Sequence, residues 1–223
     1  MHAAPEAFVF DAYGTLFDPY SVTGLAERLA PGKGAALSQL WRSKQLEYTW
    51  LGSLMQRRHD FGVVTSEALD YALAALAIPL DAHARRALLD AWLTLQPYPD
   101  TQAALAKLAP RPRWILSNGT RAMLDPLVES SGLSVHIDGV LSVDPADVYK
   151  PHPAVYRLAA DKLALPTDRI GFVSANCWDA IGAKAFGFRT WWINRGGLPA
   201  DRHAPAPDSI VSSLQAMVDE VTT

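Results

Sequence analysis

Short runs of apolar, β-favouring residues recur along the chain and predict strands at residues 7–10, 113–117, 139–143, 170–174 and 190–194. The runs are unbroken by polar residues, which is typical of strands that are buried on both faces of a sheet. Helical patterns separate the later runs, so the order of elements predicts an α/β, Rossmann-like core with a mostly parallel sheet. The helices expected there are Asp100–Leu108, Arg121–Ser131, Pro153–Leu163 and Trp178–Phe186.

The segment between the first and second predicted strands contains helical patterns but no strand-like run. A structureless loop of that length is implausible in a compact domain. We therefore expect an inserted all-helical cap domain at 19–96, closed by the "QPYPD" break, and an α/β core domain at 1–18 and 97–223. The helices expected in the cap are Val22–Leu29, Ala35–Leu54, Ser66–Leu76 and His83–Leu95.

Composition and charge narrow the class of protein. The 223 residues are 49% hydrophobic, and 20 Lys+Arg face 23 Asp+Glu for a net charge of -3. No basic field would attract nucleic acid or an anionic membrane, so we expect neither partner. The single cysteine, Cys177, cannot form an internal disulfide. No signal-peptide pattern and no apolar stretch near the ~18 residues of a membrane span is present, so we expect a cytoplasmic protein.

Polar residues follow several predicted strands at the point where each strand ends. In open parallel sheets, ligands bind outside the carboxyl ends of the strands. One strand can end on a capping Asp or Ser for structural reasons alone, but several such ends at one edge favour a functional site. The residues concerned are Asp11, Ser117, Asn118, Lys150, Ser174, Asn176 and Asp179.

Four segments resemble, in order, the motifs of the haloacid dehalogenase superfamily: "FDAYGTLFD", "SNGT", "YKPHPAVY" and "SANCWDAIGAKAFGF". The segment "LWRSKQLEYTW" is similar to the cap helix of its L-2-haloacid dehalogenase (type II) members. The resemblance covers nearly the whole chain. It implies a homodimeric hydrolase that cleaves the carbon–halogen bond of short 2-haloalkanoic acids, which are L-2-haloacids or haloacetates. The products would be a 2-hydroxyacid and halide.

Two positions in these motifs favour a dehalogenase over a magnesium phosphatase. Phosphatases of the superfamily carry a second aspartate where this chain has Tyr13, and that aspartate protonates the leaving oxygen. A halide leaves without a proton, so loss of the acid fits carbon–halogen cleavage. Ser174 stands where magnesium-dependent relatives have a carboxylate, and a hard dication needs such oxygens. We therefore expect no metal and no cofactor, with Lys150 supplying the positive charge.

The resemblance implies a role for each motif residue. Asp11 would attack C2 of the substrate and form an aspartyl ester, and Asp179 would activate the water that hydrolyses this ester. The residues that would position the water or orient these groups are Lys150, Asn176, Thr15, Ser174 and Tyr156. The substrate carboxylate would be held by Ser117 and the backbone N–H groups of Ala12 and Tyr13, and the halide by Arg42 and Asn118. The apolar pocket would comprise Leu46, Phe61 and Trp178.

Helical periodicity separates two faces of the cap segment. Leu37, Trp41, Tyr48, Leu51 and Met55 share one stripe, which we expect to pack the cap. Arg42, Leu46 and Trp50 fall on another face, which can look into the cleft.

Several alternatives stay open at this stage. Leu46, Phe61 and Trp178 are equally residues that a core would use, and Tyr156 could simply pack its ring. A magnesium-dependent phosphatase and a non-catalytic binding protein on the same fold remain rival functions. The preferred halogen, fluoride included, the substrate chain length and the enantioselectivity are not encoded in these motifs.

Overall fold

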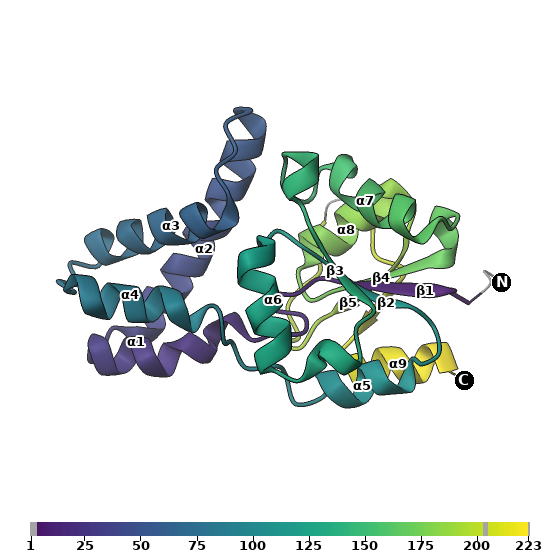
Figure 1. Ribbon diagram of the computed structural model, residues 1–223, viewed down its shortest axis with the longest axis horizontal. Coiled ribbons are helices and arrows are strands. Elements are labelled where there is room, and N and C mark those ends of the chain that lie inside the picture. The colour runs from purple at the N-terminus through teal and green to yellow at the C-terminus, as the bar shows by residue number, and fades with distance from the viewer. Residues whose placement is uncertain (1–3, 203–204, 223) are drawn as a thin grey trace.

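The core is built on a parallel sheet in the order β3-β2-β1-β4-β5-β6 (Figure 1). The computed structural model describes residues 4–202 and 205–222. Its strands are β1 (Ala7–Phe10), β2 (Arg113–Ser117), β3 (Gly139–Ser142), β4 (Ile170–Ser174), β5 (Arg189–Ile193) and β6 (Ser209–Val211). β1 lies in the middle of the sheet and all four of its residues are buried. This burial explains its unbroken apolar sequence.

Helices cover both faces of the sheet. In Figure 1, α5 and α9 lie below it and α7 and α8 above it. The core helices are α5 (Thr101–Lys107), α6 (Arg121–Ser130), α7 (Pro153–Leu163), α8 (Cys177–Phe186) and α9 (Leu214–Thr222). Short 3₁₀ turns, named η, are η2 (Leu133–Val135), η3 (Asp144–Ala146) and η4 (Thr167–Arg169). None of the helices in the described residues is long and apolar enough to cross a membrane.

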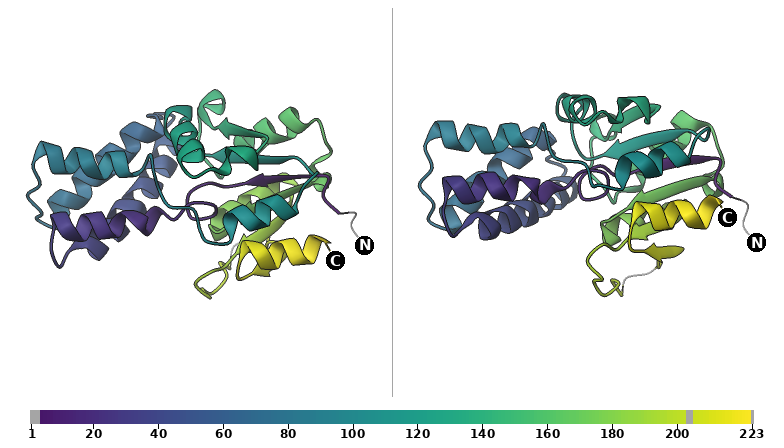
Figure 2. Two further views of the ribbon diagram at one scale, coloured as in Figure 1. Left: turned by 60° about the horizontal axis from the view of Figure 1, so that its bottom comes forward. Right: turned by 90° about the horizontal axis from the view of Figure 1, so that it is seen from below.

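The remaining helices form a separate group beyond the carboxyl ends of the strands, as Figure 2 shows. They are η1 (Pro19–Val22), α1 (Thr23–Leu29), α2 (Gly34–Leu54), α3 (Phe61–Ala75) and α4 (Ala82–Ala91). Asp60 and Asp81 cap α3 and α4 by accepting hydrogen bonds from Val63 and Ala84. We call this group the cap. The division into two domains at 19–96 stays a prediction.

Contacts between the cap and the core include hydrogen bonds at the entry to the cap and near the carboxyl end of α2. The chain enters and leaves the cap side by side, where Asp18 N donates to Gln96 O at 2.8 Å. At the other end of α2, the Tyr149 hydroxyl donates to the carbonyl of His59 at 2.6 Å. The guanidinium of Arg58 forms an ion pair with Asp144 and lies over the Tyr149 ring. The contacts near the carboxyl end of α2 adjoin Lys150, because Tyr149 precedes it in the chain.

The predicted α/β class is confirmed, and so are the five predicted strands, to within one residue at their ends. β6 and α9 were not predicted. α3 begins at Phe61 rather than Ser66, and α4 ends at Ala91 rather than Leu95, where a turn takes over. The Asp60 cap was the signal that could have placed the start of α3.

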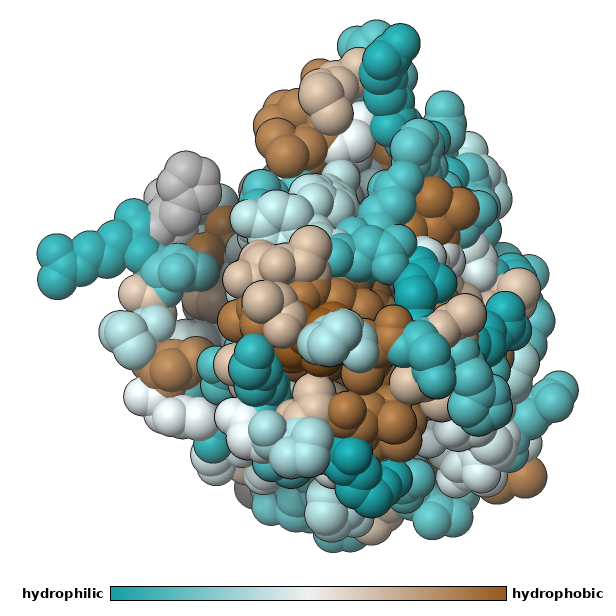
Figure 3. Space-filling view, turned by 90° about the vertical axis from the view of Figure 1, so that its left-hand side faces the viewer, coloured by the Kyte–Doolittle hydropathy of each residue, from teal (hydrophilic) through white to brown (hydrophobic). Residues whose placement is uncertain are grey.

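The predicted packing stripe of α2 is wrong at its carboxyl end. Leu37 and Trp41 are buried, but Leu51 and Met55 are 41% and 60% exposed. The carboxyl end of α2 projects beyond the other cap helices (Figure 1), so no neighbour covers these side chains. Figure 3 looks at the cap end and shows hydrophobic patches on it. The large apolar residues that are exposed in the described part of the cap are Tyr20, Trp50, Leu51, Leu54, Met55, Val63 and Tyr71.

Candidate active site

The register of the sheet brings Asp11 to the carboxyl edge beside the ends of β2 and β4. Phe10 pairs with Ile115 on one side and Val173 on the other. Asp11, 6% exposed, therefore lies level with the ends of both neighbouring strands. Its Oδ2 accepts hydrogen bonds from Thr15 Oγ1 at 3.1 Å and Asn176 Nδ2 at 2.9 Å. Both bonds fix the orientation of the carboxylate.

Lys150 bridges two buried carboxylates. Its ammonium lies 3.1 Å from Asp11 Oδ1 and 2.9 Å from Asp179 Oδ2, and its side chain is 1% exposed. Burial lowers the pKa of Lys150, but the two carboxylates outweigh burial and the net effect raises it. Lys150 is therefore a permanent cation between Asp11 and Asp179. The Asn118 side chain accepts a hydrogen bond from the Lys150 backbone N–H at 3.1 Å and so holds the Lys150 segment in place.

Asp179 is fully buried in the first turn of α8. Burial raises its pKa to about 6, with Asp11 adding to the rise and Lys150 and Tyr156 opposing it. The Tyr156 hydroxyl donates to Asp179 Oδ1 at 2.8 Å. Burial and the neighbouring Asp179 carboxylate raise the pKa of Tyr156 well above its ordinary value, so this hydroxyl stays a donor.

Thr15 and Ser174 shape the loops that carry these groups. Thr15 Oγ1 accepts a hydrogen bond from the Ala175 N–H at 2.8 Å, which ties the loop after β1 to the loop after β4. Ser174 Oγ accepts from the Asn176 N–H at 3.1 Å. Both side chains are fully buried. Ser174 thus acts on the site through the backbone that carries Asn176, and Thr15 acts both through the backbone and through its own hydrogen bond to Asp11.

A second group of donors lies where the loop after β1 approaches β2. Ser117 is fully buried, and its Oγ accepts from the Gly119 N–H at 3.2 Å, which leaves its own proton to donate. Within the described part of the chain, the backbone N–H groups of Ala12 and Tyr13 donate no hydrogen bond. Backbone donors of this kind suit an anion such as a carboxylate.

Arg42 reaches the site from the cap. Its side chain is buried, and it donates to the Tyr13 carbonyl at 3.4 Å and to Gln45 Oε1 at 2.6 Å. Burial lowers the pKa of Arg42, and the nearby Asp11 carboxylate opposes this effect. An arginine remains charged in such a setting. The cap thus adds a second cation to the site, besides the Lys150 ammonium that the core supplies.

Aromatic rings wall the site on the cap side. The Tyr13 ring stacks on Phe61 with centroids 5.5 Å apart and meets Trp92 at 5.4 Å. Burial is the main cause that raises the pKa of Tyr13. Phe61 is 1% exposed. Both residues therefore exclude water from the region above Asp11.

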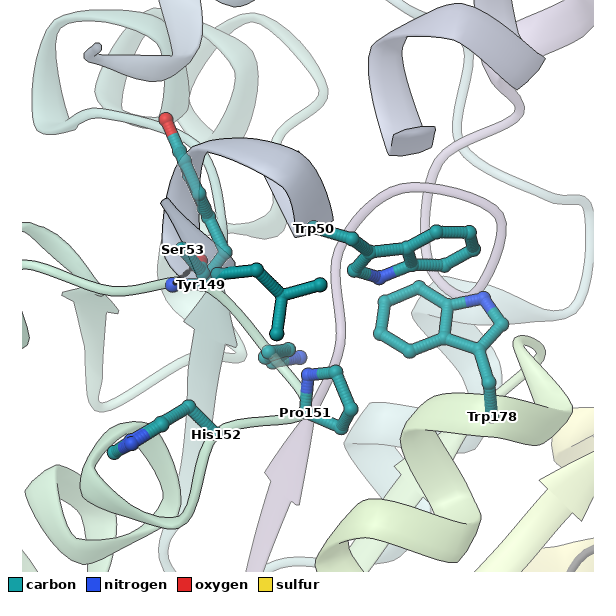
Figure 4. A pocket seen from close by; sticks show the side chains of 8 residues that line it. Trp50, Ser53, Tyr149, Pro151, His152 and Trp178 are labelled. Carbon is teal, nitrogen blue, oxygen red and sulfur yellow. Dashed lines mark hydrogen bonds between the residues drawn. The ribbon is translucent and has the colours of Figure 1, made fainter. Parts of the chain in front are cut away.

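The structure places the two remaining predicted residues farther along α2 and α8. Leu46 lies one turn after Arg42 and is partly buried. Trp178 precedes Asp179 and packs edge-on against Trp50 with centroids 5.4 Å apart. Figure 4 shows these two indoles facing each other from α2 and α8 at the side of a cavity.

Gln45 and Trp92 belong to the site but were not predicted. Gln45 is fully buried and links Arg42 to Thr65, to which its amide donates at 2.7 Å. The Arg42 guanidinium lies 6.0 Å from the Trp92 ring. The three-residue spacing of Arg42 and Gln45 on a helix was a usable signal. Trp92 is distant from Arg42 in the sequence, and only the folding of the cap brings the two residues together. No local sequence pattern indicates this contact.

Comparison with known proteins agrees with this geometry. The family model for haloacid dehalogenase-like hydrolases matches residues 5–187. The chain belongs to this family. It is 46% identical over 216 residues to the (S)-2-haloacid dehalogenase of Pseudomonas sp. (strain YL), which covers 96% of this chain and 93% of the relative. The haloacetate dehalogenase H-2 of Moraxella sp. (strain B) is 40% identical, with 96% of each chain covered.

A solved structure of the family matches the fold closely. The L-2-haloacid dehalogenase of Xanthobacter autotrophicus, solved with chloropropionic acid covalently bound, has a TM-score of 0.92 and 41% identity. The match covers 98% of each chain. The predicted relationship to the L-2-haloacid dehalogenase group of this family is confirmed.

Proposed function

We propose that this chain is a hydrolytic dehalogenase that converts short 2-haloalkanoic acids into 2-hydroxyacids and halide. The observation that carries this proposal is the pair of carboxylates on one ammonium. Asp11 and Asp179 both contact Lys150 Nζ, and Asp11 is further held by Asn176 and Thr15. Such an arrangement offers a fixed nucleophile beside a separate base.

In the first step, a carboxylate oxygen of Asp11 attacks C2 of the substrate from the side opposite the halogen. The new C–O bond forms as the carbon–halogen bond breaks, and the halide leaves with its electron pair. The configuration at C2 inverts. The hydrogen bonds that Thr15 and Asn176 give to Oδ2 orient the attacking group and reduce the cost of alignment.

Two groups of donors fit the two ends of the substrate. Ser117 and the backbone N–H groups of Ala12 and Tyr13 bind its carboxylate. Arg42 and the amide of Asn118 stabilise the charge that grows on the halide. This second interaction strengthens as the bond breaks, so it lowers the barrier rather than only the ground state.

In the second step, Asp179 takes a proton from water, and the water oxygen adds to the carboxyl carbon of the Asp11 ester. Collapse of this intermediate releases the 2-hydroxyacid, whose oxygen takes up one of the two protons of the water. The other proton passes to solvent, and Asp11 and Asp179 are again carboxylates. Lys150 offsets the negative charge that develops, and Asn176 positions the water. Tyr156 and Ser174 hold Asp179 and Asn176 in place, as their hydrogen bonds support.

A phosphatase is the competing function, and two features of the site oppose it. Tyr13 has no carboxylic acid with which to protonate an alkoxide leaving group, and its ring packs against Phe61 and Trp92. The Lys150 ammonium already lies between the two carboxylates that would otherwise bind a cation. We accordingly propose a reaction that needs neither metal nor organic cofactor.

Three further properties are proposals that follow from the sequence. Leu46, Phe61 and Trp178 form the apolar side of the substrate site. The chain acts in the cytoplasm as a homodimer, as the resemblance to the L-2-haloacid dehalogenases implies. Sedimentation velocity tests the dimer, since a monomer at all concentrations would contradict it.

Halide release tests the proposed reaction. We expect release from chloroacetate and from one enantiomer of 2-chloropropionate, with no loss after exhaustive EDTA treatment. Fluoroacetate and bromoacetate rank the leaving groups. Hydrolysis of p-nitrophenyl phosphate with magnesium, without halide release from any 2-haloacid, would instead identify a phosphatase.

A further inference from the structure

A cavity of about 410 Å³ lies between the carboxyl end of α2 and the core (Figure 4). Small-molecule sites usually have volumes of roughly 300–1,000 Å³. Its lining comes from α2, from the segment between η3 and α7, and from the start of α8. The residues are Trp50, Ser53, Leu54, Tyr149, Lys150, Pro151, His152 and Trp178.

One end of the cavity is at the surface and the other is at the catalytic lysine. Leu54 is 80% exposed, and Pro151 and His152 are also exposed. Lys150 is 1% exposed, and its ammonium contacts Asp11 and Asp179. The cavity is therefore an outward extension of the site in which we place C2 of the substrate.

The walls between these ends are mainly apolar. Trp50, Leu54, Tyr149, Pro151 and Trp178 line the cavity, and the Lys150 ammonium points to the carboxylates behind it. A charged occupant would lose hydration there, and the polar groups of Ser53 and Lys150 in the lining already bond within the protein. A hydrocarbon chain gains free energy from the same walls.

Helix α2 connects the halide end of the site to this cavity. Arg42, Leu46, Trp50 and Leu54 follow one another at intervals of four residues, which form a row about 6 Å per step along a helix. Arg42 contacts the backbone above Asp11, and Trp50 packs against Trp178. The row therefore leads from the reacting carbon toward the surface.

From this geometry we infer that the cavity binds the alkyl chain of longer 2-haloalkanoic acids and that Trp50 and Leu54 set the preferred chain length. The inference rests on the proposed function, which it extends from the reacting group to the rest of the substrate. Chain carbons beyond C3 leave the site beside Trp178, pass Trp50 and reach Leu54 at the rim.

Binding of unhalogenated carboxylates tests this inference without turnover. Titration calorimetry with butanoate, hexanoate and octanoate should show Kd falling about fourfold for each methylene that is buried. Leu54→Asp places a charge at the rim, where its exposure makes it compatible with folding. This variant should weaken octanoate binding at least about tenfold and change butanoate binding less than about twofold.

Leu51→Asp is the matched control, because Leu51 is an exposed leucine of the same helix that lines a different cavity. We expect it to bind all three acids like the wild type. Leu54→Trp narrows the rim without charge and should also weaken octanoate selectively. A Kd independent of chain length, or equal effects of Leu54→Asp and Leu51→Asp, would overturn the inference. Chloride release from chloroacetate, measured in parallel, tests the proposed function separately.

Discussion

Lys150 Nζ donates to Asp179 Oδ2 at 2.9 Å while the same ammonium contacts Asp11. The two carboxylates therefore share one cation. When Asp11 becomes an ester it loses its charge, and Lys150 then serves Asp179 alone. Because Asp11 is one of the groups that raise the pKa of Asp179, ester formation lowers that pKa and keeps the base ionised for the second step.

The first prediction concerns pH. Asp179 must be ionised to accept a proton, and its pKa, about 6 in the free enzyme, falls when Asp11 becomes an ester and loses its charge. Ester hydrolysis should therefore still be fast at pH 6 and slow only at lower pH. Rapid-quench mass spectrometry should find no more esterified enzyme at pH 6 than at pH 8, and more at pH 4.5. In Asp179→Asn, hydrolysis should be slow at every pH.

Removal of the shared cation should destabilise the protein in a pH-dependent way. In Lys150→Met, Asp11 and Asp179 face each other without a counter-charge, and the pKa of Asp179 rises further because Lys150 no longer opposes the effect of burial. The free energy of unfolding should fall by about 3–5 kcal/mol at pH 8. The deficit should shrink as pH falls, because the folded variant takes up a proton at Asp179 before the unfolded chain does. Urea unfolding at several pH values measures this, and an equal deficit at all pH values would contradict it.

Arg42 should contribute mainly to the transition state. Arg42→Ala removes a preorganised cation near the halide and should lower kcat by ~10²–10³. Gln45→Leu breaks the 2.6 Å bond that orients the guanidinium and should lower kcat less, by about tenfold. Lys44→Ala is the control on the same helix, since its partly exposed ammonium pairs with Glu47. Near wild-type turnover in Arg42→Ala would show that this cation is not used.

The contacts of Tyr149 with the cap should stabilise the segment of the cap that follows α2. Tyr149→Phe removes the hydrogen bond to the His59 carbonyl but keeps the ring under Arg58. We expect a stability loss of about 1 kcal/mol and faster hydrogen exchange in residues 53–60. Tyr71→Phe, a tyrosine elsewhere on the cap, should leave exchange in that segment unchanged.

The sequence predicted the elements that local pattern determines and failed where tertiary packing decides. The central strands were readable because burial on both faces requires apolar runs. β6 was not, because this edge strand of three residues leaves Ile210 50% exposed. In α2, the periodicity correctly predicted burial of Trp41 but wrongly predicted burial of Met55, because the end of this helix extends beyond the helices that pack against it.

The candidate site divides in the same way. Asp11, Lys150 and Asp179 were predicted because each follows a recognisable motif at a strand end. The short distances from the Lys150 ammonium to the two carboxylates were not predicted, because they depend on how α8 and the segment before α7 pack. The two partners of Arg42 differ in the same respect. Gln45 lies about one helical turn away in the sequence and could have been predicted, whereas Trp92 lies fifty residues away and could not.

The last prediction concerns the covalent role of Asp11. An ester route and direct attack by water both invert C2, so product configuration does not separate them. They differ in the source of the new oxygen. If water adds to the carboxyl carbon of Asp11, the first product molecule carries an original Asp11 oxygen. In H₂¹⁸O with enzyme in excess, label should therefore appear in the peptide that contains Asp11 and not in the 2-hydroxyacid. Asp179→Asn should slow hydrolysis more than alkylation and let the ester accumulate. Label in the first-turnover product, with none in Asp11, would exclude the covalent route even for an active dehalogenase.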